Sequence, residues 1–167
     1  MATGDYLRCL GTAVAKSNGM EATDQPDEVC PPANILIVDD EEHLRFSVYL
    51  TLRKAGHQVS AAANGREALA ILHNQFLGPA PIELMVLDLR MPQVDGLTLL
   101  KILQAEHLHL PVIGITGSME FAVIEQMLAH GCSAVLRKPF ESDELLRHID
   151  NALRESRARN ASSEGFA

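Results

Sequence analysis

The sequence contains no tryptophan, and aromatic residues make up only 4% of it. Stacked rings therefore cannot form the core, which must be built from aliphatic side chains. Hydrophobic residues account for 47% of the 167 positions, enough for one aliphatic core of ordinary size. Length and composition together predict one domain, with short segments outside it.

Basic residues are also scarce. The chain has 14 Lys and Arg against 22 Asp and Glu, which gives a formal net charge of -8. A protein that binds duplex nucleic acid needs a basic face, so this balance disfavours direct contact with nucleic acid. Solubility is the simplest explanation of such an acidic surface.

Cysteines are few, and long apolar runs are missing. Cys9, Cys30 and Cys132 are not at metal-ligand spacing, and a sparse, odd count is typical of a reducing compartment rather than of a disulfide scaffold. No apolar run reaches transmembrane length, and the N-terminus lacks the basic and apolar regions of a signal peptide. We therefore expect a cytoplasmic protein without membrane contact.

Hydrophobic patterning divides the chain into three parts. Residues 1–33 have no lasting apolar period, which predicts a mobile N-terminal arm; the alternative is that the natural start lies elsewhere. Residues 34–157 carry strong patterning and form the predicted domain. Residues 158–167 are predicted to be a C-terminal tail. Because nothing of domain size follows, we expect any output to come from the surface of the domain or from the arm.

Five apolar runs alternate with amphipathic stretches in the predicted domain. The first run, Ile35 to Val38, is wholly apolar and rich in β-branched residues, as in a strand buried on both faces. A helical stretch follows, with Leu44, Val48 and Leu52 four residues apart. The other strands are predicted at 57–62, 82–89, 110–116 and 133–136. Strict alternation predicts an α/β fold, a doubly wound five-stranded parallel sheet with helices on both faces.

Polar residues stand where these runs end. Asp39 and Asp40 follow the first run, Asp88 and Thr116 lie near the ends of the third and fourth, and Lys138 follows the fifth. The carboxyl ends of parallel strands share one edge, where ligands bind. Three carboxylates there repel one another unless a cation lies among them, and all-oxygen ligands suit Mg²⁺. Asp39 and Asp40 could instead cap the next helix, but capping does not account for Asp88.

The same residues suit phosphoryl transfer. A carboxylate can attack phosphorus and form an acyl phosphate. The transition state spreads negative charge over equatorial oxygens, which a metal, a cationic side chain and a hydrogen-bond donor would stabilise. Asp40, Lys138 and Thr116 would meet these three needs around Asp88.

These residues stand in four longer motifs. They are Val-Asp39-Asp40-Glu-Glu, Leu-Asp88-Leu-Arg-Met-Pro-Gln-Val-Asp-Gly96, Ile-Thr116-Gly and Leu-Arg-Lys138-Pro-Phe140. Over about residues 34–157, the chain resembles the receiver domain of two-component response regulators, of the stand-alone chemotaxis type. The resemblance implies a (βα)5 flavodoxin-like fold. It also implies a signalling switch that assists only its own phosphorylation and dephosphorylation, rather than an enzyme.

The resemblance implies a role for each acid. Asp88 would be the phosphoryl acceptor. Asp40 would bind Mg²⁺ directly, and Asp39 would hold the ion largely through water. Asp88 and the backbone carbonyl of Arg90 would complete the protein ligands.

It also implies how the site reports its state. Lys138 would pair with Asp88 or with the phosphoryl group, and the Lys138–Pro139 bond would be cis. The Thr116 hydroxyl would move to a phosphoryl oxygen. Receivers usually carry Tyr or Phe three residues before the lysine, but this chain has Val135 there, which has no ring to rotate.

The implied partners are proteins. A histidine kinase or a histidine phosphotransfer protein would donate the phosphoryl group. A downstream protein would read the face made by the fourth helix, fifth strand and fifth helix, and a homodimer is a further arrangement.

Two alternatives stay open, a phosphate sink and a receiver-like module that binds partners without phosphorylation. A phosphatase of the haloacid dehalogenase type is disfavoured because Arg90 stands where its second acid is needed. A dinucleotide enzyme is disfavoured because no G-x-G-x-x-G follows the first strand.

Overall fold

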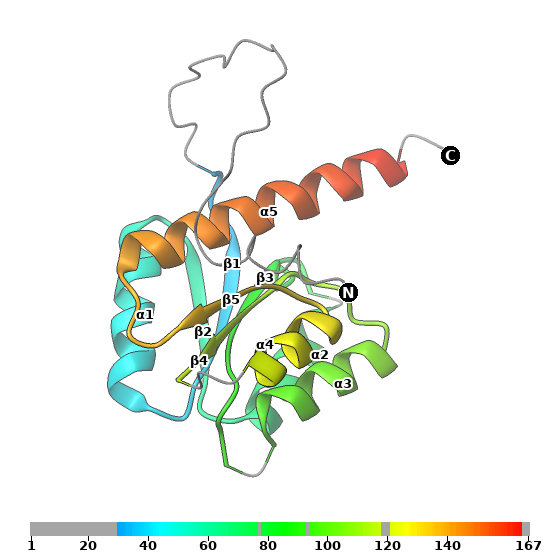
Figure 1. Ribbon diagram of the computed structural model, residues 1–167. Helices are drawn as coiled ribbons and strands as arrows, with labels where there is room; N and C mark the ends of the chain where they lie inside the picture. Colours follow the sequence, from blue (N-terminus) through cyan, green and yellow to red (C-terminus); the bar gives the residue numbers. More distant parts are fainter. Residues whose placement is uncertain (1–29, 77, 93, 118–120, 165–167) are drawn as a thin grey trace, which may run out of the picture.

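The computed structural model describes residues 30–76, 78–92, 94–117 and 121–164. Strands and helices alternate along the chain and form one sheet with the order β2-β1-β3-β4-β5, in which every pairing is parallel (Figure 1). The elements are β1 (Asn34–Val38), α1 (Glu42–Lys54), β2 (Gln58–Ala62), α2 (Gly65–Phe76), β3 (Leu84–Asp88), α3 (Gly96–Ala105), β4 (Val112–Thr116), α4 (Phe121–Ala129), β5 (Cys132–Arg137) and α5 (Ser142–Glu164). The predicted doubly wound α/β fold is confirmed.

The sheet separates two aliphatic cores. Alternate side chains of β1 point to opposite faces, so that Ile35 and Ile37 join one core and Leu36 and Val38 the other. The first core is covered by α1 and α5, and the second by α2, α3 and α4. All five residues of β3 and of β4 are buried, which explains why these strands read as continuous apolar runs in the sequence.

The winding of the sheet reverses beside β1. The chain passes from β1 to β2 on one side and then crosses to β3 on the other side of β1. The carboxyl ends of β1 and β3 therefore diverge into loops at the switch point, where doubly wound sheets bind their ligands. Glycines in the left-handed region lie just after two helices, Gly56 after α1 (φ 94°) and Gly131 after α4 (φ 95°), where a left-handed residue ends a helix.

The N-terminal limit of the packed domain differs from the predicted one. Residues 1–29 of the predicted arm lie outside the described residues. However, Cys30 and Ala33 are each only 3% exposed and belong to the core beneath α1 and α5. The prediction placed them in the arm because two prolines and several acids surround them, which hides two isolated apolar residues from a periodicity analysis.

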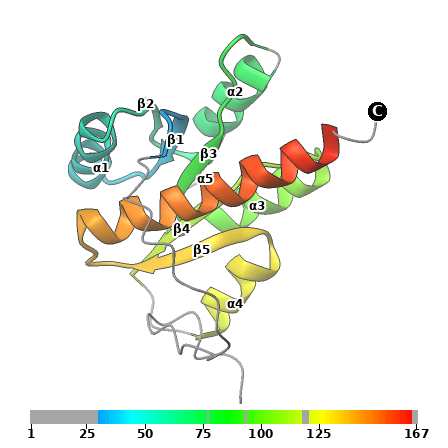
Figure 2. The ribbon, with the colours of Figure 1, turned by 90° about the horizontal axis from the view of Figure 1, so that it is seen from above.

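The last helix is also longer than predicted. We expected the C-terminal tail to begin at residue 158, but α5 continues to Glu164. No Gly or Pro interrupts this stretch, and Ala and Arg favour the helix. The C-terminal turns of α5, red in Figures 1 and 2, project past the strands. Among the helices of the described ranges, none has the length and apolar character needed to cross a membrane.

One arginine ties the N-terminal segment to α5. The Arg157 guanidinium donates to Glu83 Oε2 at 2.9 and 3.3 Å, to the carbonyl oxygens of Pro31 and Pro32 at 3.2 and 3.3 Å, and to Cys30 Sγ at 3.3 Å. We call these five residues the Arg157 bracket. It joins segments that precede β1 and β3 to the last helix, at the amino-terminal edge of the sheet.

Candidate functional site

The loop after β1 carries two acids in different environments. Asp39 is buried and Asp40 is exposed. Asp39 Oδ1 accepts a 2.7 Å hydrogen bond from the backbone N–H of Glu41, and Glu41, the N-cap of α1, makes no side-chain capping bond. The capping interpretation is therefore correct only in part, because Asp39 bonds the chain just before the helix and the cap itself lies two residues later.

Asp88 is the last residue of β3 and is 5% exposed. Its Oδ1 accepts from the backbone N–H of Arg90 at 3.1 Å. The loop that follows folds back onto this strand end, where the N–H of Gly96 donates to Leu89 O at 3.0 Å. A Cβ on Gly96 would lie 2.6 Å from Asp88 O and 2.9 Å from Leu89 Cα, so only glycine permits this approach.

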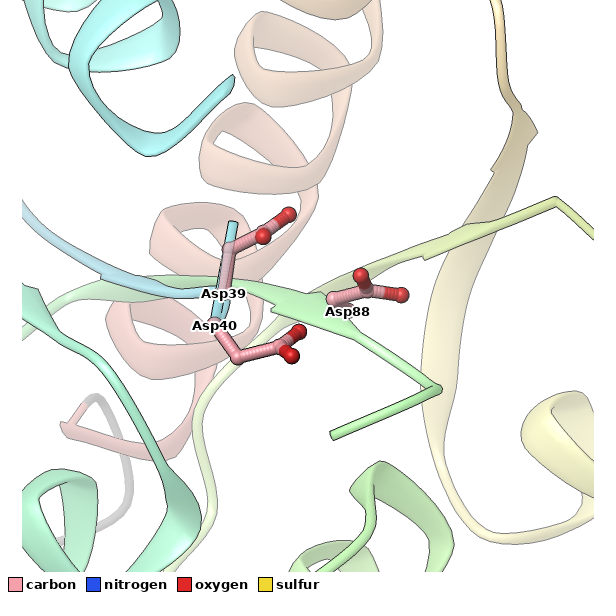
Figure 3. A group of neighbouring side chains, drawn as sticks. All are labelled: Asp39, Asp40 and Asp88. Atoms are coloured by element: carbon pink, nitrogen blue, oxygen red, sulfur yellow. The ribbon is translucent and has the colours of Figure 1, made fainter. Parts of the chain in front are cut away.

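The two loops bring three carboxylates together, as Figure 3 shows. One oxygen each from Asp39, Asp40 and Asp88 lies within 4.8 Å of the others, and within the described ranges this is the one such group of potential metal ligands. All the donors are carboxylate oxygens, without His or Cys, which is the donor set preferred by Mg²⁺. The residues present therefore fit this ion.

We call Asp39, Asp40 and Asp88 the acidic group. Burial makes the negative charge of this group costly. Desolvation raises the pKa of Asp39 above its ordinary value, and the charge of Asp88 adds to this effect. The bond from Glu41 N–H and the charge of Lys138 act in the opposite direction but do not cancel it. A cation bound among the carboxylates would remove this cost.

Lys138 connects two of the acids. Its Nζ lies 2.6 Å from Asp88 Oδ2 and 3.3 Å from Asp39 Oδ2. Burial by itself lowers the pKa of this lysine, but its hydrogen bond to Asp88 and the charges of both acids outweigh burial, so the pKa is raised and the group stays an ammonium. The Lys138–Pro139 peptide bond is cis, which confirms that prediction.

The other predicted residues surround this centre. Thr116 ends β4 and is fully buried, and its carbonyl accepts from Lys138 N–H at 2.9 Å. The Arg90 side chain is exposed. Val135 is half-buried in β5, opposite Gly114 of β4. The structure thus gathers Asp39, Asp40, Asp88 and Lys138, while the chemical roles assigned to these residues stay predictions.

Sequence reasoning missed one contact at the site. Arg45 in α1 donates from Nη1 to the backbone carbonyl of Asp39 at 2.6 Å. A cationic residue in the first turns of the helix that follows an acid pair was the available signal. Periodicity does not reveal it, because the apolar period marks only the buried face of α1.

Comparison with known proteins agrees with this geometry. The family model of the response regulator receiver domain matches residues 35–150. The chain is 34% identical over 119 residues to the C4-dicarboxylate transport transcriptional regulatory protein DctD of Rhizobium meliloti, a match that covers 71% of this chain and 25% of that protein. It is 31% identical over 120 residues to the response regulator SaeR of Staphylococcus aureus, covering 72% of this chain and 50% of SaeR. The chain therefore spans only a quarter to a half of the length of these relatives.

A solved structure is similar over nearly its whole length. The Vibrio cholerae chemotaxis protein CheY4 is 30% identical, with a TM-score of 0.65, and the match covers 72% of this chain and 98% of CheY4. The region matched by the family model contains the five strands from Ile35 onward, the acidic group and Lys138. The chain belongs to the response regulator receiver domain family.

Proposed function

We propose that this chain is a phosphoryl-accepting receiver of a two-component phosphorelay, in which Asp88 takes a phosphoryl group from a phosphorylated histidine kinase or histidine phosphotransfer protein. One observation carries the proposal. The Lys138 ammonium lies 2.6 Å from Asp88 Oδ2, beside three carboxylates whose oxygens lie within 4.8 Å of one another. A carboxylate nucleophile, an ammonium and a divalent-cation site are the parts that phosphoryl transfer to an aspartate requires.

In the proposed reaction, a carboxylate oxygen of Asp88 forms a bond to phosphorus. The phosphorus–nitrogen bond to the donor imidazole breaks, and the nitrogen keeps the electron pair. The negative charge of the carboxylate then lies on the phosphoryl oxygens. The Lys138 ammonium, which pairs with Asp88 Oδ2 before the reaction, is close enough to pair with a phosphoryl oxygen afterwards. Asp39, Asp40 and Asp88, with the backbone carbonyl of Arg90, would hold Mg²⁺, and the bound ion would supply positive charge to the phosphoryl oxygens.

A macromolecular donor is supported by the surface beside the site. Phe46 and Leu50 are one helical turn apart on α1 and are 59% and 40% exposed. The helix begins at Glu42, directly after the acid pair and its neighbour Glu41. Exposed large apolar side chains next to a reactive centre favour docking of a protein over diffusion of a small donor alone.

The proposed output is a change on the face of α4, β5 and α5. Lys138 N–H is bonded to Thr116 O, so movement of Lys138 toward a phosphoryl group acts on the end of β4. Phe121, 55% exposed at the start of α4, offers an aromatic contact for a downstream protein. A coupling of about 1–3 kcal/mol is typical of such switches, which means a population shift rather than a new fold.

We place this exchange in the cytoplasm. Cys30 and Cys132 are free thiols buried in the cores, and no disulfide joins cysteines within the described residues. Unpaired buried cysteines are typical of reducing compartments.

The test is covalent labelling followed by mass spectrometry. With Mg²⁺ and a small phosphodonor such as phosphoramidate, the protein should gain one phosphoryl group at Asp88. Asp88→Asn should abolish the product. Asp95→Asn is the matched control, because Asp95 is a nearby acid that caps α3 through a 2.7 Å bond to Thr98 N–H, and it should leave labelling intact. A phosphoryl group on another residue would contradict the proposal.

Amide hydrogen exchange separates the switch from a phosphate sink. A switch should change protection along α4 when beryllofluoride binds with Mg²⁺. A change confined to the loops after β1 and β3 would favour the sink.

A further inference from the structure

Asp39, the first residue of the Asp39–Asp40 peptide, is held by hydrogen bonds to three parts of the chain. The backbone N–H of Asp39 donates to Ala62 O at the end of β2 at 3.2 Å. Its carboxylate accepts from Glu41 N–H and from Lys138 Nζ. Every polar group of Asp39 except its carbonyl therefore has a hydrogen-bond partner, which lies at the end of β2, just before α1 or just after β5.

The carbonyl of Asp39 would lack a helical partner without Arg45. In α1 the first intrahelical backbone bond runs from Arg45 N–H to Glu41 O at 2.9 Å, so the Asp39 carbonyl precedes the helical ladder. At a residue that is 3% exposed, an unpaired carbonyl would cost free energy. The Arg45 guanidinium donates a charge-assisted hydrogen bond of 2.6 Å to this carbonyl.

Fixing this carbonyl also fixes Asp40. The peptide group is planar, so the Asp39 carbonyl and the N and Cα atoms of Asp40 lie in one plane. Asp40 itself is exposed, and in the described part of the chain no hydrogen bond holds its carboxylate. The direction of the Asp40 side chain toward Asp88, visible in Figure 3, therefore depends on the backbone that Arg45 holds.

We propose that Arg45 is a positioning residue for the divalent-cation site, which it supports by holding the Asp39–Asp40 peptide so that the Asp40 carboxylate converges with that of Asp88. This inference rests on the proposed function, because it assigns a role at the same site. In this role Arg45 would act through the peptide alone, because its guanidinium bonds the Asp39 carbonyl and not a carboxylate of the acidic group. Partners of this outer kind contribute about 10-fold to 100-fold to metal affinity.

The test is a calorimetric titration of Mg²⁺ into the full chain and its variants. Arg45→Met should weaken Mg²⁺ binding about 10-fold, and the initial rate of phosphorylation should return to within about twofold of the original once Mg²⁺ is saturating. Arg45→Lys keeps the charge but not the planar fork, so it should recover only part of the affinity. Arg53→Met is the matched control on the same helix, because its guanidinium contacts a backbone carbonyl, His57 O at 3.4 Å, away from the acids.

The outcomes separate this inference from the proposed function. Unchanged Mg²⁺ affinity in Arg45→Met, with only a lower melting temperature, would show a purely structural role and overturn the inference. A rate that saturating Mg²⁺ does not restore would overturn it as well. If Arg45→Met does not fold, Arg45→Gln replaces it with the same expectations. Absence of Mg²⁺-dependent labelling in the unchanged chain would instead refute the proposed function.

Discussion

At the amino-terminal edge of the sheet, one guanidinium contacts a carboxylate, two carbonyls and a thiol. At the carboxyl-terminal edge three carboxylates lie together, and one ammonium contacts two of them. The same strands run between the two edges, and both edges are joined by long-range contacts between segments far apart in the sequence. In the Arg157 bracket, opposite charges are matched. At the acidic group, negative charge is left in excess.

The difference indicates what each edge is for. Matched charges at the bracket stabilise the fold, since they fasten the segment before β1 to α5. Burial of negative charge at the acidic group works against folding, because desolvation is the main cause of the raised pKa of Asp39, and the charge of Asp88 adds to it. A cost of this kind is typical of functional sites, and it is consistent with the proposed cation site.

The largest expected effect concerns the steric tightness of the carboxyl-terminal edge. Gly96→Ala should lower the free energy of unfolding by about 3 kcal/mol, because its Cβ would meet backbone atoms of Asp88 and Leu89 that cannot move aside cheaply. Gly117→Ala is the matched control at the same edge, where a new Cβ meets nothing within 4 Å. Urea unfolding of both variants checks the expectation, and equal effects would contradict it.

Most of the fold was predictable because its strands are buried on both faces. Continuous apolar runs at 35–38 and 84–87 identify parallel strands with little ambiguity, and acids directly after such runs must lie at the ligand-binding edge. The patterning alone therefore predicts that Asp39, Asp40 and Asp88 lie together. The separate environments of Asp39 and Asp40 were not predictable, since burial of adjacent residues after a strand depends on how the loop turns.

The Arg157 bracket was not predictable for a different reason. No sequence pattern predicts which residues an arginine on the polar side of a helix will contact. Cys30 and Glu83, which contact Arg157, lie far from it in the sequence. The same holds for Arg45 and the Asp39 carbonyl. Periodicity reports which side chains are buried, whereas contacts of charged side chains with backbone carbonyls depend on the final packing.

The second expected effect concerns the Arg157 bracket at the amino-terminal edge of the sheet. Arg157→Ala should lower the free energy of unfolding by about 2 kcal/mol, because it leaves the carboxylate of Glu83 and two carbonyls without their cationic donor. Arg147→Ala, at an exposed position of the same helix, should change it by no more than about 0.5 kcal/mol. Chemical unfolding with and without Mg²⁺ provides the measurement. A loss in Arg157→Ala that varies with Mg²⁺ would show that the two edges are not independent.

The smallest expected effect has the opposite sign and lies at the acidic group. In EDTA at neutral pH, Asp39→Asn should raise the free energy of unfolding by about 1 kcal/mol, because it removes a buried charge while its amide oxygen can still accept from Glu41 N–H. Since the pKa of Asp39 is raised in the folded state, the folded protein binds the proton more tightly than the unfolded chain does. The cost of this charge is therefore absent below the ordinary Asp pKa and appears as the pH rises through the folded-state pKa, and the gain in the variant should follow the same course.

Mg²⁺ at ten times its dissociation constant should stabilise the original protein by about 1.4 kcal/mol and the variant by less. Glu125→Gln, an exposed acid on α4, is the control and should show neither change. Loss of stability in Asp39→Asn at neutral pH without Mg²⁺ would mean that the bond from Lys138 outweighs the burial of the charge, and the contrast between the two edges would fail.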